Sequence, residues 1–162
     1  MPILHASVRI LGCGNLLMGN DGVGLKVIEA LQNTEIEGLK NLDIVDAGVC
    51  GLDLLNYFDG AKKVIIVDAV LADSPVGSVH RLDGKDLIKS TEEPLNLVSG
   101  HDLTITDVLR IGEHVQTLPE IVVIGIEIGT IVTEATLEIT PEVLEGVDEA
   151  IRLITEEISS TF

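Results

Sequence analysis

Three aspartates stand where short apolar runs end, and a histidine stands close to the start of a later amphipathic segment. The acids are Asp21, Asp46 and Asp68, and the histidine is His101. In open α/β sheets ligands bind where the carboxyl ends of the strands meet, so these side chains are candidates for one shared crevice. Asp21, Asp68 and His101 supply two carboxylates and an imidazole, a partial ligand set for a divalent transition metal. This pattern predicts a candidate metal site with open coordination positions.

Each of these residues also has a simpler structural interpretation. Asp21 precedes Gly22, where a helix is expected to begin, and an aspartate at that place often caps free amides. Asp68 would be able to accept hydrogen bonds from loop amides, and His101 would be an ordinary surface residue at a helix start. What favours a site is the convergence of all three at one end of the expected sheet.

Other chemistries fit the sequence less well. The first loop, residues 12–24, begins like a dinucleotide fingerprint, but Leu17 stands where the third glycine is required. Neither a G-x-S-x-G nor an H-E-x-x-H motif is present. Cys13 and Cys50 are candidate thiolate nucleophiles or small buried apolar side chains, and the second interpretation is favoured. Their spacing indicates neither a disulfide framework nor a zinc site.

The positioning elements are strands that alternate with helices along the whole chain. Expected strands cover 8–11, 43–46, 63–67 and 121–126, and expected helices cover 22–32, 52–58, 101–111 and 143–158. Residues 76–82 alternate like a half-exposed strand that lacks the crossover needed for parallel pairing, so an antiparallel strand is expected there. The prediction is a single α/β domain over 1–162. It has three layers: a mainly parallel twisted sheet with one antiparallel strand, and helices on both faces.

Composition excludes several classes of partner. The 162 residues carry a net charge of -17, with three Phe or Tyr residues and no Trp, so nucleic acid and anionic membranes are not expected partners. The acidity indicates either solubility in a salty cytoplasm or steering of a basic protein partner. The first residues, 1–9, do not resemble a signal peptide, so a cytoplasmic protein is expected, and we expect a monomer.

The loop over residues 12–24, with Asp21-Gly22-Val23-Gly24 at its end, resembles the opening motif of the hydrogenase maturation proteases. The order and spacing of four further motifs make the resemblance specific and extend it through nearly the whole chain. They are Asp46-Ala47-Gly48 with Gly51-Leu52-Asp53-Leu54-Leu55, Val67-Asp68-Ala69, Ser99-Gly100-His101-Asp102-Leu103, and Ile139-Thr140-Pro141-Glu142-Val143.

The resemblance implies an α/β endopeptidase that removes a short C-terminal extension from a [NiFe] hydrogenase large-subunit precursor after nickel insertion. It implies that Asp21, Asp68 and His101 contact nickel carried by this partner, with Asp46 as a base or as a residue that positions its loop. It is compatible with a type that serves a coenzyme F420-reducing hydrogenase. In the isolated protein zinc or cadmium would be able to occupy the same ligands. The alternative function is a non-hydrolytic chaperone that checks the precursor for nickel.

Two positions depart from the family pattern. Many relatives carry a second acid immediately before the first-loop ligand, and this chain has Asn20 there. The stretch 127–138 also lacks the Pro-Glu pattern associated with the family before the helix start at Thr140-Pro141. The second difference is expected to bear on substrate choice.

Overall fold

A six-stranded sheet forms the centre of the molecule in the computed structural model, which describes residues 8–34, 36, 41–90, 96–97 and 103–161. The strands are β1 (Val8–Cys13), β2 (Leu42–Gly48), β3 (Lys63–Leu71), β4 (Val79–Asp83), β5 (Asn96–Leu97) and β6 (Glu120–Glu127). The sheet order is β2-β1-β3-β6-β4, and β5 pairs with β3 beside this path.

Pairing in the sheet is parallel among β1, β2, β3 and β6 and antiparallel at β4 and β5. The mainly parallel α/β fold is therefore confirmed, and so is the antiparallel strand expected over 76–82, which is β4. The two-residue β5 was not expected. Since β2 lies on one side of β1 and β3 on the other, the chain reverses its direction of travel across the sheet at β1, where open α/β sheets form their crevice.

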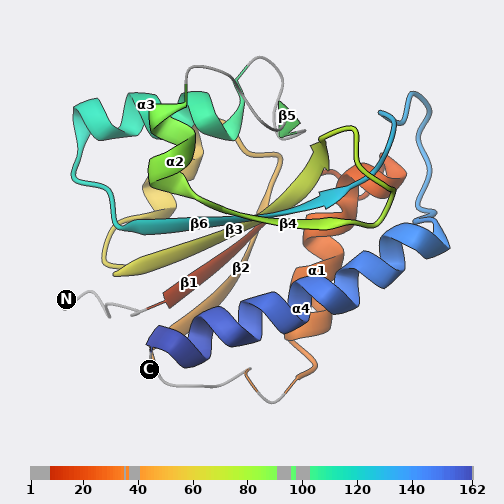
Figure 1. Cartoon of the computed structure of the whole chain (residues 1–162), viewed down its shortest axis with the longest axis horizontal. Coiled ribbons are helices and arrows are strands. Elements are labelled where there is room, and N and C mark those ends of the chain that lie inside the picture. Colours follow the sequence, from red (N-terminus) through yellow and green to blue (C-terminus); the bar gives the residue numbers. More distant parts are fainter. Residues whose placement is uncertain (1–7, 35, 37–40, 91–95, 98–102, 162) are drawn as a thin grey trace.

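Helices cover both faces of the sheet (Figure 1). On one face lie α1 (Val23–Leu31) and α4 (Pro141–Thr161), and on the other lie α2 (Gly84–Lys89) and α3 (Ile105–Val115). Two short 3₁₀ helices complete the set, η1 (Gly19–Gly22) and η2 (Leu52–Tyr57). No helix among the residues that the structure describes combines the length and hydrophobicity needed to span a membrane.

The core is divided into two layers by the alternation of strand side chains. In β3, Ile65, Val67 and Ala69 pack toward α1 and α4, whereas Val64 and Ile66 pack toward η2, α2 and α3. Helices cover both faces of this strand, so neither face needs polar side chains, which explains the continuous apolar run.

One ion cluster joins α4 to the sheet. Glu157 accepts from Arg81 and forms an ion pair with Lys63 at 2.5 Å, although Lys63 is 4% exposed and Glu157 8%. Burial works to raise the pKa of Glu157, but hydrogen bonds and charge from Arg81 and Lys63 outweigh it and hold the pKa below its ordinary value.

The helix expected over 101–111 begins later, at Ile105. Thr104 caps it, because its hydroxyl accepts from the Asp107 amide while the Asp107 carboxylate accepts from the Thr104 amide. This reciprocal pair fixes the first turn of the helix at Thr104. The short helix α2 was not expected at all.

Candidate functional site

Glycines let the loop between β1 and α1 fold tightly against the strand ends. A Cβ added at Gly24 would lie 2.3 Å from the Cys13 carbonyl oxygen, at the end of β1, and 2.4 Å from that of Val67, inside β3. A Cβ at Gly14 would lie 2.3 Å from the Asp21 carbonyl oxygen. Only glycine permits these approaches. They place η1, which carries Asp21, in contact with β3.

The carboxylate of Asp21 has one buried oxygen that stands out among the described residues. Among the described residues, Oδ1 of Asp21 is buried and has no hydrogen-bond partner. Burial raises the pKa of Asp21, and a hydrogen bond from the Asn15 backbone opposes that shift only in part. The start of α1 has no side-chain cap bond, so Asp21 does not cap that helix. A desolvated carboxylate oxygen without a donor fits the place of a cation ligand.

Asp68 is fully buried within β3. The strand was expected to end just before Asp68, but it continues to Leu71, and Asp68 lies opposite Gly125 of β6. Its Oδ1 accepts from the Ala69 amide at 2.8 Å, and its exposed fraction is zero. A buried acid among the apolar residues of a strand costs folding free energy, which is a reason to look for function there.

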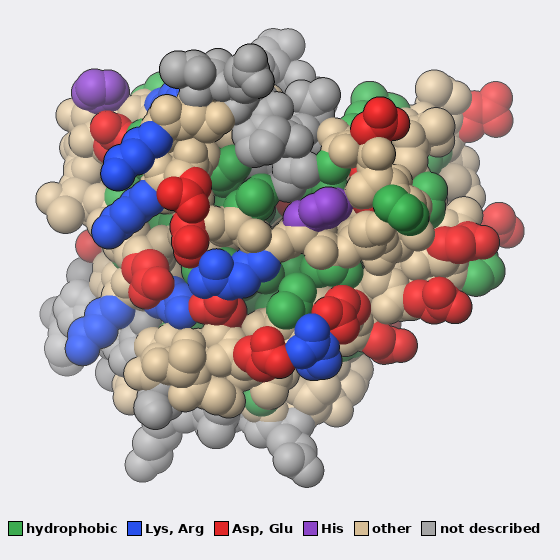
Figure 2. Space-filling model, viewed as in Figure 1, with side chains coloured by type: hydrophobic (Ala, Val, Ile, Leu, Met, Phe, Trp, Pro, Cys, Tyr) green, Lys and Arg blue, Asp and Glu red, His purple; other side chains and the backbone are tan. Residues whose placement is uncertain are grey.

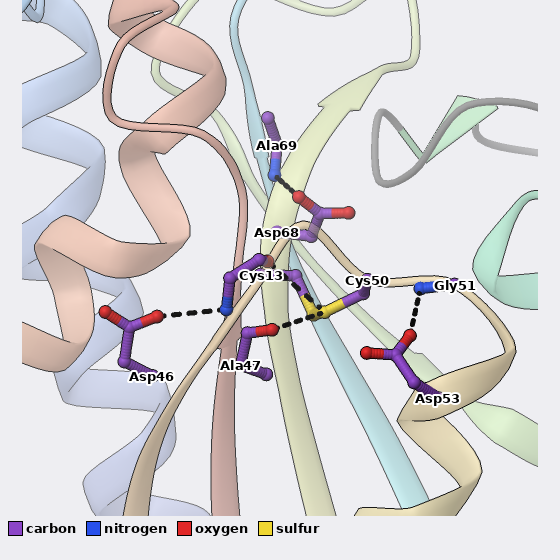
Figure 3. The surroundings of a disulfide bond; sticks show 9 residues. Cys13, Asp46, Ala47, Cys50, Gly51, Asp53, Asp68 and Ala69 are labelled. Atoms are coloured by element: carbon purple, nitrogen blue, oxygen red, sulfur yellow. Dashed lines mark hydrogen bonds between the residues drawn. A yellow bond between two sulfur atoms is a disulfide. The ribbon is translucent and has the colours of Figure 1, made fainter.

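Asp46 stands near the end of β2 and is exposed. Its Oδ1 accepts from the Gly48 amide at 2.9 Å, and Gly48 has a φ of 64°, so the carboxylate stabilises a tight turn. Figure 3 shows that the carboxylates of Asp46 and Asp68 do not point toward one another. The structure therefore places Asp46 at the same end of the sheet as Asp68 without bringing their carboxylates together.

Cys13 and Cys50 form a disulfide, which corrects the expectation that both are free, buried thiols. They are 37 residues apart in sequence, but β1 and β2 are neighbours, and Cys13 pairs with Gly48 at the end of β2. The two Cα atoms are 5.7 Å apart, within the range for a disulfide. Figure 3 shows the bond between the end of β1 and the loop that follows β2. The pairing of β1 with β2 brings the two cysteines together, and the spacing of the cysteines in the sequence does not reveal this pairing.

Asn20, the departure from the family pattern, has a structural role. Its Oδ1 accepts from the Thr140 amide at 2.9 Å and its Nδ2 donates to Thr140 Oγ1 at 3.3 Å. Met18 and Thr136 form a parallel bridge in the same region. The first loop is thus fixed to the segment that leads into α4.

Glu127, at the end of β6, is an internal anchor that the sequence analysis missed. Its buried carboxylate accepts from the amides of Ala72, Ser74 and Gly129 and from the Ser74 hydroxyl. Burial works to raise the pKa of Glu127, but these hydrogen bonds together hold it below its ordinary value. The signal was present, since Glu127 ends a continuous apolar strand. Its carboxylate holds the loops after β3 and β6 together.

The Ser74 hydroxyl also lies 2.9 Å from His80 Nε2. Because Ser74 donates its proton to Glu127, it can only accept from the histidine. Ser74 and His80 therefore do not form a nucleophile–base pair.

His101 lies outside the described residues. Within the part of the chain that the structure does describe, no group of three His, Cys, Asp or Glu side chains is arranged to hold a metal. The ligand set of Asp21, Asp68 and His101 therefore stays a prediction.

A family model for hydrogenase maturation proteases matches residues 25–157. A putative hydrogenase maturation protease of Methanocaldococcus jannaschii is 31% identical over 155 residues, which cover 93% of this chain and 96% of that protein. The delta subunit of a coenzyme F420 hydrogenase from Methanothermobacter thermautotrophicus is 28% identical, over 94% of this chain and 95% of that protein.

Solved structures agree with this likeness. The [NiFe] hydrogenase maturation protease HybD of Thermococcus kodakarensis has a TM-score of 0.73 and 27% identity, with 92% of this chain and 97% of that chain covered. The hydrogenase maturating endopeptidase HybD of Escherichia coli has a TM-score of 0.74 at 21% identity, with 95% and 93% covered, and supports the fold. The chain belongs to the hydrogenase maturation protease family and is a peptidase.

Proposed function

We propose that this peptidase removes the C-terminal extension of a [NiFe] hydrogenase large-subunit precursor after nickel insertion, and that it recognises the nickel held by that substrate. The observation that carries the proposal is the buried Oδ1 of Asp21, which has no hydrogen-bond partner among the described residues. Next to β3, an oxygen of this kind is suited to complete the coordination of a metal that arrives with another protein.

In this proposal Asp21, Asp68 and His101 contact the substrate's nickel and so dock the scissile bond. A bound divalent ion polarises a carbonyl or activates water. The partial ligand set implies weak and promiscuous binding by the isolated chain, so zinc or cadmium would occupy the ligands when supplied in excess. Asp46 acts by positioning its loop, a role supported by its hydrogen bond to Gly48.

The proposed setting is the cytoplasm, with the enzyme acting as a monomer on the precursor. A type that serves a coenzyme F420-reducing hydrogenase is supported by the 28% identity to the delta subunit of such an enzyme. In reducing compartments disulfides are rare outside hyperthermophiles, so the redox state of Cys13 and Cys50 in cells is a direct check on this setting.

The test is cleavage of a nickel-loaded precursor, followed by mass spectrometry of the product. We expect Asp68→Asn to abolish shortening of the precursor while far-UV circular dichroism stays unchanged, because the amide keeps the shape but loses the ligand charge. Asp148→Asn is the matched control, since Asp148 is an exposed acid on α4, and it should cleave like the wild type. Full processing by Asp68→Asn would contradict the proposed role of this acid. Binding without shortening by the wild type would favour the chaperone.

A further inference from the structure

Exposed apolar side chains gather in the loops at the carboxyl ends of the parallel strands. Ten large apolar side chains are exposed among the described residues. Seven of them lie in these loops or, for Leu52, at the first residue of η2, so their distribution is uneven. Six of the seven follow β1, β2 and β6: Leu16, Leu17, Val49, Leu52, Ile131 and Leu137. Leu137 is 75% exposed and Leu17 62%. Side chains of this size exposed together commonly mark an interaction site.

The loops lie side by side and form one continuous surface, which we call the carboxyl-edge surface (residues 14–22, 46–52, 72–78 and 128–140). The Gly14 amide donates to the Gly48 carbonyl oxygen, which joins the first two segments. The Thr136 amide donates to the Leu17 carbonyl oxygen, which joins the first and the last. A Cβ at Gly129 would lie 2.7 Å from Val76 Cγ2, so the third segment contacts the last.

Charge on the carboxyl-edge surface has a single sign. All ten Lys and Arg residues of the chain lie outside its four segments, which contain several acids: Asp21, Asp46, Asp73, Glu134 and Glu138. Figure 2 shows acidic and apolar side chains and no Lys or Arg on the right-hand part of the visible face, where Figure 1 places the loops that follow the strands together with the first turns of α4. Such a surface attracts basic partners and repels acidic ones.

We infer that the carboxyl-edge surface docks a protein segment in which apolar side chains are flanked by Lys or Arg. The apolar side chains supply contact area, and the acids around them select the charge of the partner and speed its approach. A second copy of this chain is a poor occupant, because two surfaces of the same negative sign would face each other. The inference depends on the proposed function only for the identity of the partner, which would be the precursor beside its cleavage point.

The surface is tested first without the precursor. Two synthetic peptides of about twelve residues, alternating Leu with Lys or Leu with Glu, are titrated into the methyl-labelled protein and followed by NMR. We expect the Lys peptide to shift the methyl signals of Leu16, Leu17, Ile131 and Leu137, and added salt to weaken binding. Val115 on α3 is 66% exposed and should not shift. Equal shifts by both peptides, shifts confined to α3, or self-association through these methyls would overturn the inference.

The second test uses cleavage kinetics on the nickel-loaded precursor. The double variant Leu17→Ser/Leu137→Ser should raise KM about tenfold and leave kcat nearly unchanged, because these side chains contribute to docking and not to chemistry. Val115→Ser is the matched control for an exposed apolar side chain elsewhere, and its KM should equal that of the wild type. An unchanged KM in the double variant would overturn the docking surface while leaving the proposed function intact. Selective binding of the Lys peptide by a wild type that does not cleave the precursor would support the surface and refute the function.

Discussion

The disulfide between Cys13 and Cys50 should supply a large part of the stability of the fold. It closes a chain segment with a sequence separation of 37, and the loss of loop entropy in the unfolded chain corresponds to about 4 kcal/mol for a segment of that length. The net stability of a domain is only about 5 to 15 kcal/mol. Reduction should therefore lower the free energy of unfolding by a substantial fraction without changing the fold.

Urea unfolding of the oxidised and the reduced protein measures this difference. The chain has no Trp and one Tyr, so far-UV circular dichroism is a better probe than fluorescence. With a slope of about 2 kcal/mol per molar urea, the midpoint should fall by about 2 M after reduction. Cys13→Ala/Cys50→Ala should resemble the reduced protein and show no further response to reductant.

Two results would refute the reasoning. The first is a thiol titration that finds two free cysteines in the folded, air-oxidised protein, since the bond would then not exist. The second is a reductant-induced midpoint shift below about 0.5 M, because that would mean that the unfolded chain gains little freedom when the bond opens.

Three further results are expected. Glu157→Gln should cost about 3 kcal/mol, because Lys63 stays buried without its charge partner, and Lys63→Met/Glu157→Leu should recover most of it in thermal unfolding. The folded pKa of Glu157 lies below its ordinary value, so the stability that the ionised carboxylate contributes is present above pH 4.5 and is lost as the pH falls through the folded pKa. On the acid side, the free energy of unfolding of the wild type should therefore fall more steeply with pH than that of Glu157→Gln. Gly24→Ala should lower the free energy of unfolding in urea by about 3 kcal/mol, because the added Cβ would clash with backbone atoms. Gly48→Ala should lower it by about 1 kcal/mol, since only the positive φ at this position disfavours a side chain. Burial raises the folded pKa of Asp21, so the ionised form destabilises the fold above that pKa. Asp21→Asn should therefore raise the melting temperature at pH 7 and have no such effect at pH 3. A lower melting temperature of this variant at pH 7 would contradict the prediction.

The sheet was predictable because its central strands are buried on both faces and leave continuous apolar runs. The antiparallel strand before α2 was predictable because the connection after β3 is too short for a parallel crossover. The helix α2 was not, because it has six residues and only Gly84 and Leu87 buried, too few to produce a period. The start of α3 depended on a reciprocal bond between Thr104 and Asp107 that competes with other possible caps.

The placement of the candidate residues was only partly predictable from the sequence. The ends of parallel strands lie at one edge, so Asp21, Asp46 and Asp68 were expected there. Asp21 lies in η1 after β1 and Asp46 near the end of β2, whereas Asp68 lies inside β3, which continues to Leu71. The direction of the Asp46 carboxylate depends on a local turn with Gly48, which the strand pattern does not determine. The disulfide depends on the pairing of β1 with β2, which joins residues that are far apart in the sequence. The role of His101 stays a prediction.

The position of β6 between β3 and β4 has a consequence for synthesis on the ribosome. β4 pairs with β6 alone along the main path of the sheet, and β6 begins at Glu120, well after β4 ends at Asp83. Until β6 has emerged from the ribosome, one hydrogen-bonding edge of β3 is exposed and β4 lacks the strand with which it pairs. Unpaired apolar edges of this kind invite pairing with other chains. The growing polypeptide therefore passes through a stage in which a chaperone that shields β-strand edges would improve its yield.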